Sequence, residues 1–583
     1  MNKRKISIPV IDLFAGPGGL SEGFSVLSSF KASEVDFQVR LSIEKDPVAR
    51  KTLRLRSFVR KFPEDELPEA YYDYIRCTDK KDKKKLLEVL QSFPEWQRAD
   101  DEAWEAELGK VSPEILHRRI HKALNEASHW VLLGGPPCQV YSNVGRARHL
   151  GPGHEIRSIK DEKERKAKLE KKQKKFYDDV RHDLYRDYLK VVAIHQPDVF
   201  VMENVRDILT AKLPLKNGDG KSKEYVFDRI LRDLRDPWAA LEEEGVEGNW
   251  WKYGAGTSHG YKIHSFVVPA IIPGEHDRSE YLIKCEKFGI PQARHRVILL
   301  GIRDDIASVP FTIKEKKDQV SLKSVIGNLP PLRSGRSRGG DSPSEWLQAV
   351  KDHMTNEILN AVDDKKIRKR MRSIRERRKT NLTRGGLFVK SDYNSMQCEE
   401  ELARWIMDPR LGGVCQHETR THMDSDLSRY LFVSVCGEVN GLSPKLRHFP
   451  DCLLPAHKNI AVMRNGKKNC DFHDRFRVQI AGAPGTTVTS HICKDGHYFI
   501  HYDPRQCRSL TAREAARIQT FPDNYFFEGN RTEQYQQVGN AVPPYLALQL
   551  AGVVAGVIQT LDAVDAPDIR QERGASVSVA PVP

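Results

Sequence analysis

The chain has 583 residues, of which 39% are hydrophobic, and its formal net charge is +14. This length exceeds one compact core and predicts at least two domains, while the basic charge favours a polyanionic partner. The N-terminus resembles no signal peptide, we expect no membrane span, and the ten cysteines follow no disulfide framework, so we expect a cytoplasmic protein.

The first half of the chain alternates apolar strands with helices. A strand ending near residue 14 leads through a glycine-rich turn to a helix at 18–27, and a second strand covers 38–43. Further strands are expected at 129–133, 199–202, 261–267 and 297–302, and a further helix at 179–195. This alternation predicts a doubly wound α/β sheet, Rossmann-like, within residues 1–303.

Other segments depart from this pattern. Residues 51–127 are helical in character and highly charged, which indicates an insertion, and residues 150–178 form a charged, solvated arm. Residues 304–506 have the irregular composition of a second, smaller domain. Residues 507–563 become regular again and are expected to return to the first domain, and residues 564–583 are expected to be a disordered tail.

Cys138 lies on a proline-stiffened loop directly after the apolar strand at 129–133. Two consecutive prolines, Pro136 and Pro137, fix φ and remove two N–H donors, so the loop presents one thiol in a defined direction. This suits a nucleophile, although a buried, incidental cysteine is the alternative for the loop taken alone.

Polar side chains also follow the next strands. Glu203 comes directly after the buried run at 199–202, where ligands gather in open α/β sheets. Arg294 and Arg296 alternate at the start of a strand and are expected to share one face with Gln292. Arginine forks suit a carbonyl, a carboxylate or a phosphate. A strand-end acid in a salt bridge and solvent-exposed arginines are the simpler alternatives.

The first strand, glycine turn and helix form a possible cofactor cradle, because glycines admit close approach and the helix N-terminus offers free N–H groups. Glu44 ends the next strand, where doubly wound folds place an acid against a ribose diol. The turn departs from the Gly-x-Gly-x-x-Gly pattern and lacks a P-loop lysine, which disfavours NAD and ATP.

Six motifs occur in one order along nearly the whole chain. They are Asp12-Leu-Phe-Ala-Gly-Pro-Gly-Gly-Leu, Gly135-Pro-Pro-Cys-Gln, Met202-Glu-Asn-Val, Gly289-Ile-Pro-Gln-Ala-Arg-His-Arg, Leu510-Thr-Ala-Arg-Glu-Ala-Ala-Arg and Gln537-Val-Gly-Asn-Ala-Val-Pro-Pro. This series resembles the DNA (cytosine-5)-methyltransferase family, in its bacterial modification-methylase form.

The resemblance implies a Rossmann-like methyltransferase fold, S-adenosyl-L-methionine as cofactor and double-stranded DNA as substrate. It implies catalytic roles for Cys138, Glu203, Arg294 and Arg296, and contacts to the substrate from Pro137, Asn204, Gln292 and Thr487. The implied cofactor contacts are Phe14, Gly16, Gly18, Leu20, Glu44, Leu184, Asn540 and Ala541. Asp73 and Asp79 are candidates for an acid that contacts adenine.

The residues themselves suit this chemistry. Carbon 5 of cytosine is a poor nucleophile until something adds to carbon 6, and a thiolate can both add and leave again. The carboxyl group of Glu203 suits stabilisation at ring nitrogen 3. Because a duplex hides its bases, the cytosine must be flipped out, and residues 304–506 are the natural reader of the DNA sequence.

Several alternatives stay open from sequence alone. A transfer RNA cytosine methyltransferase and a non-catalytic DNA-binding homologue share the scaffold, and the enzyme is either paired with a restriction endonuclease or an orphan methylase. The basic segment 365–379 is either a phosphate contact or an exposed charged helix. We expect no metal site, because the scattered histidines and cysteines match no usual spacing: Cys415, His417, His422, Cys470 and His473.

Overall fold

The computed structural model describes residues 5–137, 161–162, 164, 167–168, 183–214, 223–243, 253, 258–272, 274–392, 395–455 and 474–565. Cys138, most of the charged arm, and the tail from residue 566 lie outside these described residues.

An eight-stranded sheet forms the centre of the first half, with the strand order β3-β2-β1-β4-β5-β11-β8 and β9 paired to β11. The first five strands in this order are parallel, whereas β11 is antiparallel to β5, β8 and β9. The strands are β1 (Ile6–Leu13), β2 (Val35–Glu44), β3 (Ala103–Glu105), β4 (Val131–Gly134), β5 (Val199–Val205), β8 (Tyr261–Ser265), β9 (Leu282–Lys284) and β11 (His295–Arg303). The predicted doubly wound α/β class is confirmed.

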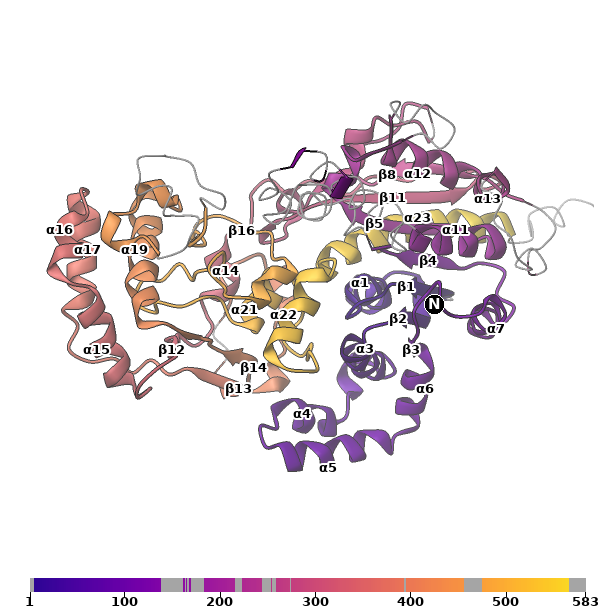
Figure 1. The fold of residues 1–583 in the computed structure, drawn as a ribbon. Coiled ribbons are helices and arrows are strands. Elements are labelled where there is room, and N and C mark those ends of the chain that lie inside the picture. Colours follow the sequence, from indigo (N-terminus) through magenta and orange to yellow (C-terminus); the bar gives the residue numbers. More distant parts are fainter. Residues whose placement is uncertain are drawn as a thin grey trace, which may run out of the picture.

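Two hydrophobic clusters cover the two faces of this sheet, because neighbouring strand residues point to opposite sides. Val131 and Val199 face the cluster that includes α1 (Gly19–Ser25) and α23 (Pro544–Asp565). Leu132 and Phe200 face the cluster that includes α7 (Pro113–Leu124), α11 (Asp183–His195), α12 (Val226–Arg235) and α13 (Pro237–Glu243). Figure 1 shows the yellow α23 running back beside the N-terminal sheet.

By length and composition alone, the C-terminal helical segment is apolar enough to cross a membrane. Within residues 531–561 the most apolar window has a mean hydropathy of 1.7, but 83% of it is buried inside the protein. Packing of α23 against α1 and the sheet accounts for this apolarity.

The segment 51–127 is only partly an insertion, which corrects the boundary expected from sequence. It contains the edge strand β3, which pairs with β2, and α7, which covers the sheet. In Figure 1, α4 (Glu69–Arg76) and α5 (Lys80–Gln91) project away from the sheet. The helices α3 (Pro47–Val59) and α6 (Pro94–Glu102) lie between this projecting pair and the sheet. Three residues of strand between helices leave no periodic signal in the sequence.

The second half builds a helical unit with its own core, which we call the α15–α19 unit (residues 343–440). It consists only of the four helices α15 (Pro343–His353), α16 (Asn356–Ala361), α17 (Lys365–Arg375) and α19 (Asp424–Asn440), which share one hydrophobic cluster. The other elements between residues 322 and 422 lie outside this helical cluster: α14 (Leu322–Ile326), β12 (Gly335–Arg336), β13 (Gly385–Lys390), α18 (Glu400–Ile406), β14 (Gly413–Glu418) and β15 (Thr421–His422). The basic segment 365–379 is thus largely α17, whose Ile367, Met371 and Ile374 are buried.

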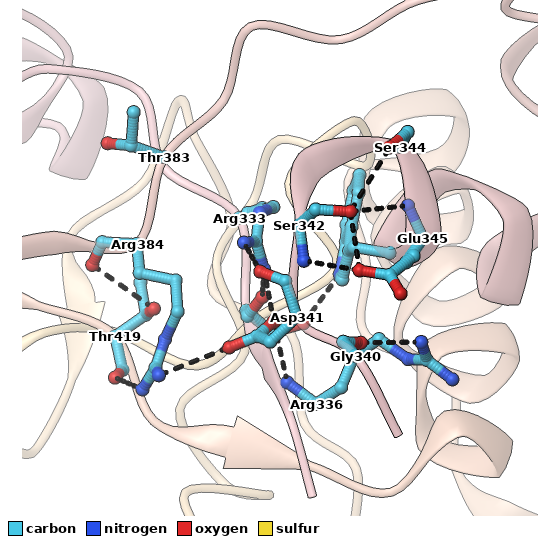
Figure 2. A network of polar contacts seen from close by, with 12 residues as sticks. Arg333, Arg336, Gly340, Asp341, Ser342, Ser344, Glu345, Thr383, Arg384 and Thr419 are labelled. Carbon is cyan, nitrogen blue, oxygen red and sulfur yellow. Dashed lines mark hydrogen bonds and ion pairs between the residues drawn. The ribbon is translucent and has the colours of Figure 1, made fainter. Parts of the chain in front are cut away.

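Asp341 anchors the chain where it enters the α15–α19 unit (Figure 2). Its carboxylate accepts hydrogen bonds from Arg333 at 2.6 Å and from Arg384 at 3.2 Å. Directly after it, Ser342 and Glu345 form a capping box at the start of α15. These charge-assisted bonds tie the residues just before β12 and just before β13 to the start of α15.

Four short elements join the two halves. β10 (Gln292–Ala293) pairs in parallel with β16 (Gly485–Thr486). Because β10 comes just before β11, this pairing connects the start of β11 to a segment far along the chain. α21 (Ala512–Ile518) is buried along its whole length, and α22 (Arg531–Asn540) leads from it to α23. The boundaries expected at residues 304 and 506 remain a prediction.

Candidate active site

The carboxyl edges of β4 and β5 bring the Cys138 loop to Glu203. Gly134 is in register with Met202, so the loop leaves β4 directly beside Glu203. A Cβ atom on Gly135 would lie 3.1 Å from Oε2 of Glu203, which shows how closely the loop backbone crosses the carboxylate. Half-buried Pro137 is the last described residue before Cys138, which itself lies outside the described residues.

Arg296 holds the Glu203 carboxylate from the antiparallel neighbour β11. Its Nε lies 2.8 Å from Oε1 of Glu203, and the two side chains are only 12% and 15% exposed. The Nη1 group of the guanidinium donates to the carbonyl of His295 at 2.8 Å, which fixes its direction. A partly buried ion pair of this kind orients the acid toward the strand edge.

Arg294 lies close to this pair but points into the protein. It is fully buried, and its guanidinium donates to the carbonyl oxygens of Val488 at 2.7 Å and Gly539 at 3.3 Å. Burial, with the nearby Arg296, lowers the pKa of Arg294 to about 9. These contacts place the Arg294 guanidinium between β11 and the C-terminal segments, and its catalytic role stays a prediction.

Gln292 likewise makes its hydrogen bonds inside the protein. Its amide donates to Gln519 at 2.7 Å and its carbonyl accepts from the N–H of Val488 at 2.6 Å. Thr487 donates its hydroxyl to the carbonyl of Ala293 at 2.7 Å. Gln292 and Thr487 therefore hold the segment around residue 488 against β10. Thr487 is half-buried and is more accessible than Gln292, which is buried.

Asn204 follows Glu203 on β5 and is 5% exposed. Its side-chain carbonyl accepts a hydrogen bond from the N–H of Val205 at 2.9 Å. The side chain thus shapes the end of the strand, and its predicted contact with substrate stays a prediction.

The glycine turn at the carboxyl end of β1 meets Glu44 at the end of β2. Phe14, Gly16 and Gly18 have φ angles of 59°, 56° and 96°, so the turn uses the left-handed region three times within five residues. The N–H of Gly16 donates to the Glu44 carboxylate at 2.8 Å. Burial raises the pKa of Glu44, against the hydrogen bonds from the backbone of Asp46 and Gly16.

Asp12 lies under the same turn and is 1% exposed. Its Oδ2 atom has no hydrogen-bond partner among the described residues, and burial raises its pKa to about 7. The hydroxyl of Tyr188, also buried, lacks a partner in the described part of the chain and interacts electrostatically with Asp12. Unpaired buried oxygens beside a glycine turn are expected where a polar ligand binds.

The remaining predicted cofactor residues lie on three helices and at the end of one of them. Ala541 lies against α1, since a Cβ on Gly19 would come within 3.3 Å of the Ala541 Cβ. Asn540 is the exposed last residue of α22. Leu20 and Leu184 are buried in the clusters on opposite faces of the sheet, at 6% and 7% exposure, which makes them packing residues at the edge of the site.

Another acidic residue, which the sequence pattern does not single out, lies at this edge of the sheet. Glu105 ends β3 directly beside Glu44, and its side chain is exposed. Asp73 and Asp79, the two candidates chosen from sequence, lie instead on α4 and at the N-cap of α5, away from the sheet. Recognising Ala103-Trp104-Glu105 as a strand that follows β2 in the sheet would have identified Glu105.

The described histidines and cysteine that were considered for zinc do not form one cluster. Cys415 donates to the carbonyl of Ile75 at 3.3 Å, and both ring nitrogens of His417 are bonded, to Thr511 and Pro330. His422 bonds to Tyr430 at 3.2 Å. Cys470 and His473 fall outside the described residues.

Comparisons with known proteins agree with the motifs. Residues 95–217 and 277–555 match the family described as C-5 cytosine-specific DNA methylase. A Type II methyltransferase of Bacillus paralicheniformis is 30% identical over 577 residues, 94% of this chain and 99% of the relative. A Type II methyltransferase of Haemophilus parahaemolyticus is 23% identical over 94% of this chain and 87% of its own length.

A more distant relative prints the reaction in its name. The DNA (cytosine-5-)-methyltransferase of Aeropyrum pernix is 25% identical over 80% of this chain and 88% of its own length. The family match spans well over half of the chain and includes Glu203, Arg296 and the C-terminal helices up to residue 555, whereas the glycine turn precedes it. The chain therefore belongs to the family of C-5 cytosine-specific DNA methylases.

Proposed function

We propose that this enzyme transfers a methyl group from S-adenosyl-L-methionine to carbon 5 of a cytosine that is flipped out of a specific duplex DNA sequence. The observation that carries the proposal is the approach of the Cys138 loop to Glu203. Gly135 lies against the Glu203 carboxylate, and Arg296 holds that carboxylate from the other side at 2.8 Å.

The Cys138 thiolate forms a bond from its sulfur to carbon 6 of the base, and the electron pair of the double bond between carbons 5 and 6 moves into the ring toward carbon 5. Glu203 stabilises this adduct by a proton or hydrogen bond at ring nitrogen 3. After carbon 5 has gained its methyl group it loses its proton, the double bond re-forms, and the sulfur leaves from carbon 6.

Arg296 contributes a fixed cation beside this acid. Its ion pair orients the Glu203 carboxylate, and a guanidinium at the same strand edge also suits the carbonyl oxygen of cytosine. Arg294 and Gln292 support Arg296 from inside the protein, because their hydrogen bonds to the backbone around Val488 and to Gly539 hold the start of β11 in place.

The residues of the glycine turn fit S-adenosyl-L-methionine, which when bound supplies an electrophilic methyl group. The buried, unpartnered Oδ2 of Asp12 suits a hydrogen-bond donor such as the amino group of the cofactor. Glu44 and the adjacent Glu105 suit the ribose hydroxyls and the adenine amine, and Phe14, Gly16, Gly18 and Ala541 complete the surrounding wall.

The DNA partner follows from the family, and its sequence-specific recognition is assigned to residues 304–506. Figure 1 shows the α15–α19 unit at the end of the molecule away from the catalytic sheet, and the segment that begins with β16 pairs with β10, so a duplex held between the two halves would present a base to Glu203. Reading of base edges requires contacts of this kind beyond the catalytic sheet.

The bacterial relatives support a role in restriction and modification. The relative from Bacillus paralicheniformis, which the chain covers almost completely, is named a Type II methyltransferase. We therefore assign the enzyme to the bacterial cytoplasm and nucleoid, either paired with a separately acting restriction endonuclease or as an orphan methylase.

Two experiments test the proposal. Bisulfite sequencing of DNA from cells that express the chain is expected to show one recurring methylated motif. The purified Cys138→Ser variant is expected to lose methyl transfer while it still binds duplex DNA. Turnover by that variant would refute the covalent mechanism, whereas methylation of transfer RNA and not of DNA by the active protein would favour the RNA enzyme.

A further inference from the structure

Three histidines from two helices meet on the outer face of the sheet, away from the predicted active site. His117 and His121 are one turn apart on α7, and His195 lies in the last turn of α11. One ligand atom from each of the three rings lies within 4.8 Å of the other two. One nitrogen of each imidazole therefore lies near a common position, although the rings come from two helices.

We propose that His117, His121 and His195 bind a divalent transition-metal ion of the zinc type, which links α7 to α11. Zinc takes imidazole nitrogens at about 2.0–2.1 Å in a tetrahedral arrangement, so bound nitrogens are separated by about 3.3 Å. Three histidines leave one coordination position for water, and His121 is exposed on the open side.

The hydrogen-bonding state of the cluster supports a ligand role. Nδ1 of His117 is buried and has no hydrogen-bond partner among the described residues. The ring of His117 is packed between His195, with ring centroids 5.1 Å apart, and Tyr253, with centroids 4.3 Å apart. Packing without a polar partner leaves a nitrogen lone pair or N–H unsatisfied, which a bound ion would correct.

The two helices add favourable electrostatics at the same point. His121 and His195 both lie in the last turns of helices that are 12 and 13 residues long. The carboxyl end of a helix carries partial negative charge, which favours a bound cation. In addition, the indole N–H of Trp130 donates to the carbonyl of His195 at 3.2 Å and holds the end of α11 against the start of β4.

The position of the cluster indicates a structural role. Val199 begins β5 just after His195, and Glu203 lies four residues further, roughly 13 Å along the strand at 3.3 Å per residue. An ion here is too far from Glu203 to take part in methyl transfer. It would instead clamp the two helices that precede β4 and β5, the strands that carry Pro137 and Glu203.

The test compares zinc binding in the full-length wild type, His121→Ala and the control His353→Ala. His121 is exposed, so its removal should leave the fold intact, and His353 is an exposed histidine at the end of α15. After treatment with a chelator, equilibrium dialysis against Zn²⁺ should show one fewer bound ion per chain in His121→Ala than in the wild type or His353→Ala. Cobalt(II) should give the visible absorption of a tetrahedral site with the same pattern.

Thermal unfolding provides a second measurement. Zn²⁺, but not Mg²⁺, should raise the Tm of the wild type and of His353→Ala, and this rise should disappear in His121→Ala. Circular dichroism checks that the variant is folded, and His121→Gln replaces it if it is not. Equal zinc binding and equal Tm shifts in wild type and the folded variant would overturn the proposal, which is independent of methyl transfer.

Discussion

The hydroxyl of Tyr72 donates a 2.7 Å hydrogen bond to the carboxylate of Asp408. Tyr72 lies on α4, in the helical projection of the N-terminal half, and Asp408 lies just after α18 in the C-terminal half. The guanidinium groups of Arg76 and Arg410 lie over the Tyr72 ring, 5.3 and 4.6 Å from its centroid. The projection thus braces the two halves of the molecule against each other.

Loss of this hydrogen bond should weaken the brace measurably. We expect Tyr72→Phe to lower the free energy of unfolding by about 1 kcal/mol, because Asp408 keeps its hydrogen bond from Asn524 and is not left unpaired. Urea denaturation of Tyr72→Phe, Asp408→Asn and the double variant gives the coupling energy. A coupling energy indistinguishable from zero would show that the contact contributes nothing to the join.

Replacing Glu203 by glutamine should separate chemistry from binding. The amide keeps the size of the side chain but can neither donate a carboxyl proton nor pair with the Arg296 cation. We expect methyl transfer to fall by roughly 10²- to 10⁴-fold, the usual range for loss of a general acid. Binding of S-adenosyl-L-methionine, measured by calorimetry, should be unchanged.

Glu315→Gln is the matched control, because Glu315 is an exposed acid that pairs only with Lys287 among the ion pairs of the described residues. It should methylate DNA at the wild-type rate. A wild-type rate for Glu203→Gln as well would remove Glu203 from the mechanism.

Two glycines in the packed helices α1 and α23 should respond in opposite directions to alanine. A Cβ on Gly23 would lie 2.3 Å from the backbone nitrogen of Leu548, whereas a Cβ on Gly552 would meet nothing within 4 Å. Gly23→Ala should therefore destabilise the protein by about 1–3 kcal/mol through overpacking. Gly552→Ala should stabilise it by about 0.4–1 kcal/mol, because alanine restricts the unfolded chain.

Thermal or urea unfolding of the two glycine variants checks this pair directly. If Gly23→Ala were as stable as Gly552→Ala, the close approach of α1 and α23 would be wrong.

Buried neutral histidines should make the protein sensitive to mild acid. Burial lowers the pKa of His417 to about 4, from 6.5 for an ordinary histidine, with Glu514 opposing and Arg508 reinforcing the change. Between these values the unfolded chain binds a proton that the folded chain excludes, so stability falls as the pH drops from about 6.5 toward 4.

The contribution of His417 can be isolated with His417→Gln. From about pH 7.5 to about pH 5.5, this residue should account for about 1 kcal/mol of the lost stability. The variant should therefore show a smaller drop in the urea midpoint over this range than the wild type does. An identical drop in both proteins would mean that His417 is protonated in the fold or titrates elsewhere.

Much of the fold and the family was predictable from local patterns. The apolar runs that predicted strands correspond to β1, β2, β4, β5, β8 and β11, and the order of motifs predicted the family that the comparisons confirm. Burial of a sheet on both faces requires long apolar runs, and these leave a clear signal in the sequence. The three-residue strand β3 leaves none, and the acid Glu105 was missed with it.

The functions of individual polar side chains were less predictable. Alternation along a strand placed Gln292, Arg294 and Arg296 together, but it could not show which of them meets another segment of the chain. In the structure Arg294 donates hydrogen bonds to the carbonyl oxygens of Val488 and Gly539, whereas Arg296 forms an ion pair with Glu203. The partner of a long arginine is determined by which distant backbone or carboxylate lies within its reach.

The doubly wound α/β class and the family could be predicted from the amino-acid sequence alone, because both depend on short stretches of hydrophobicity and on residue types at fixed spacing. The amino-acid sequence gives no sign that α4 and α5 brace the two halves, that Arg294 bonds to Val488, or that the rings of His117, His121 and His195 lie together. These relationships join residues far apart in the chain, and their geometry exists only after the hydrophobic clusters have packed the elements together.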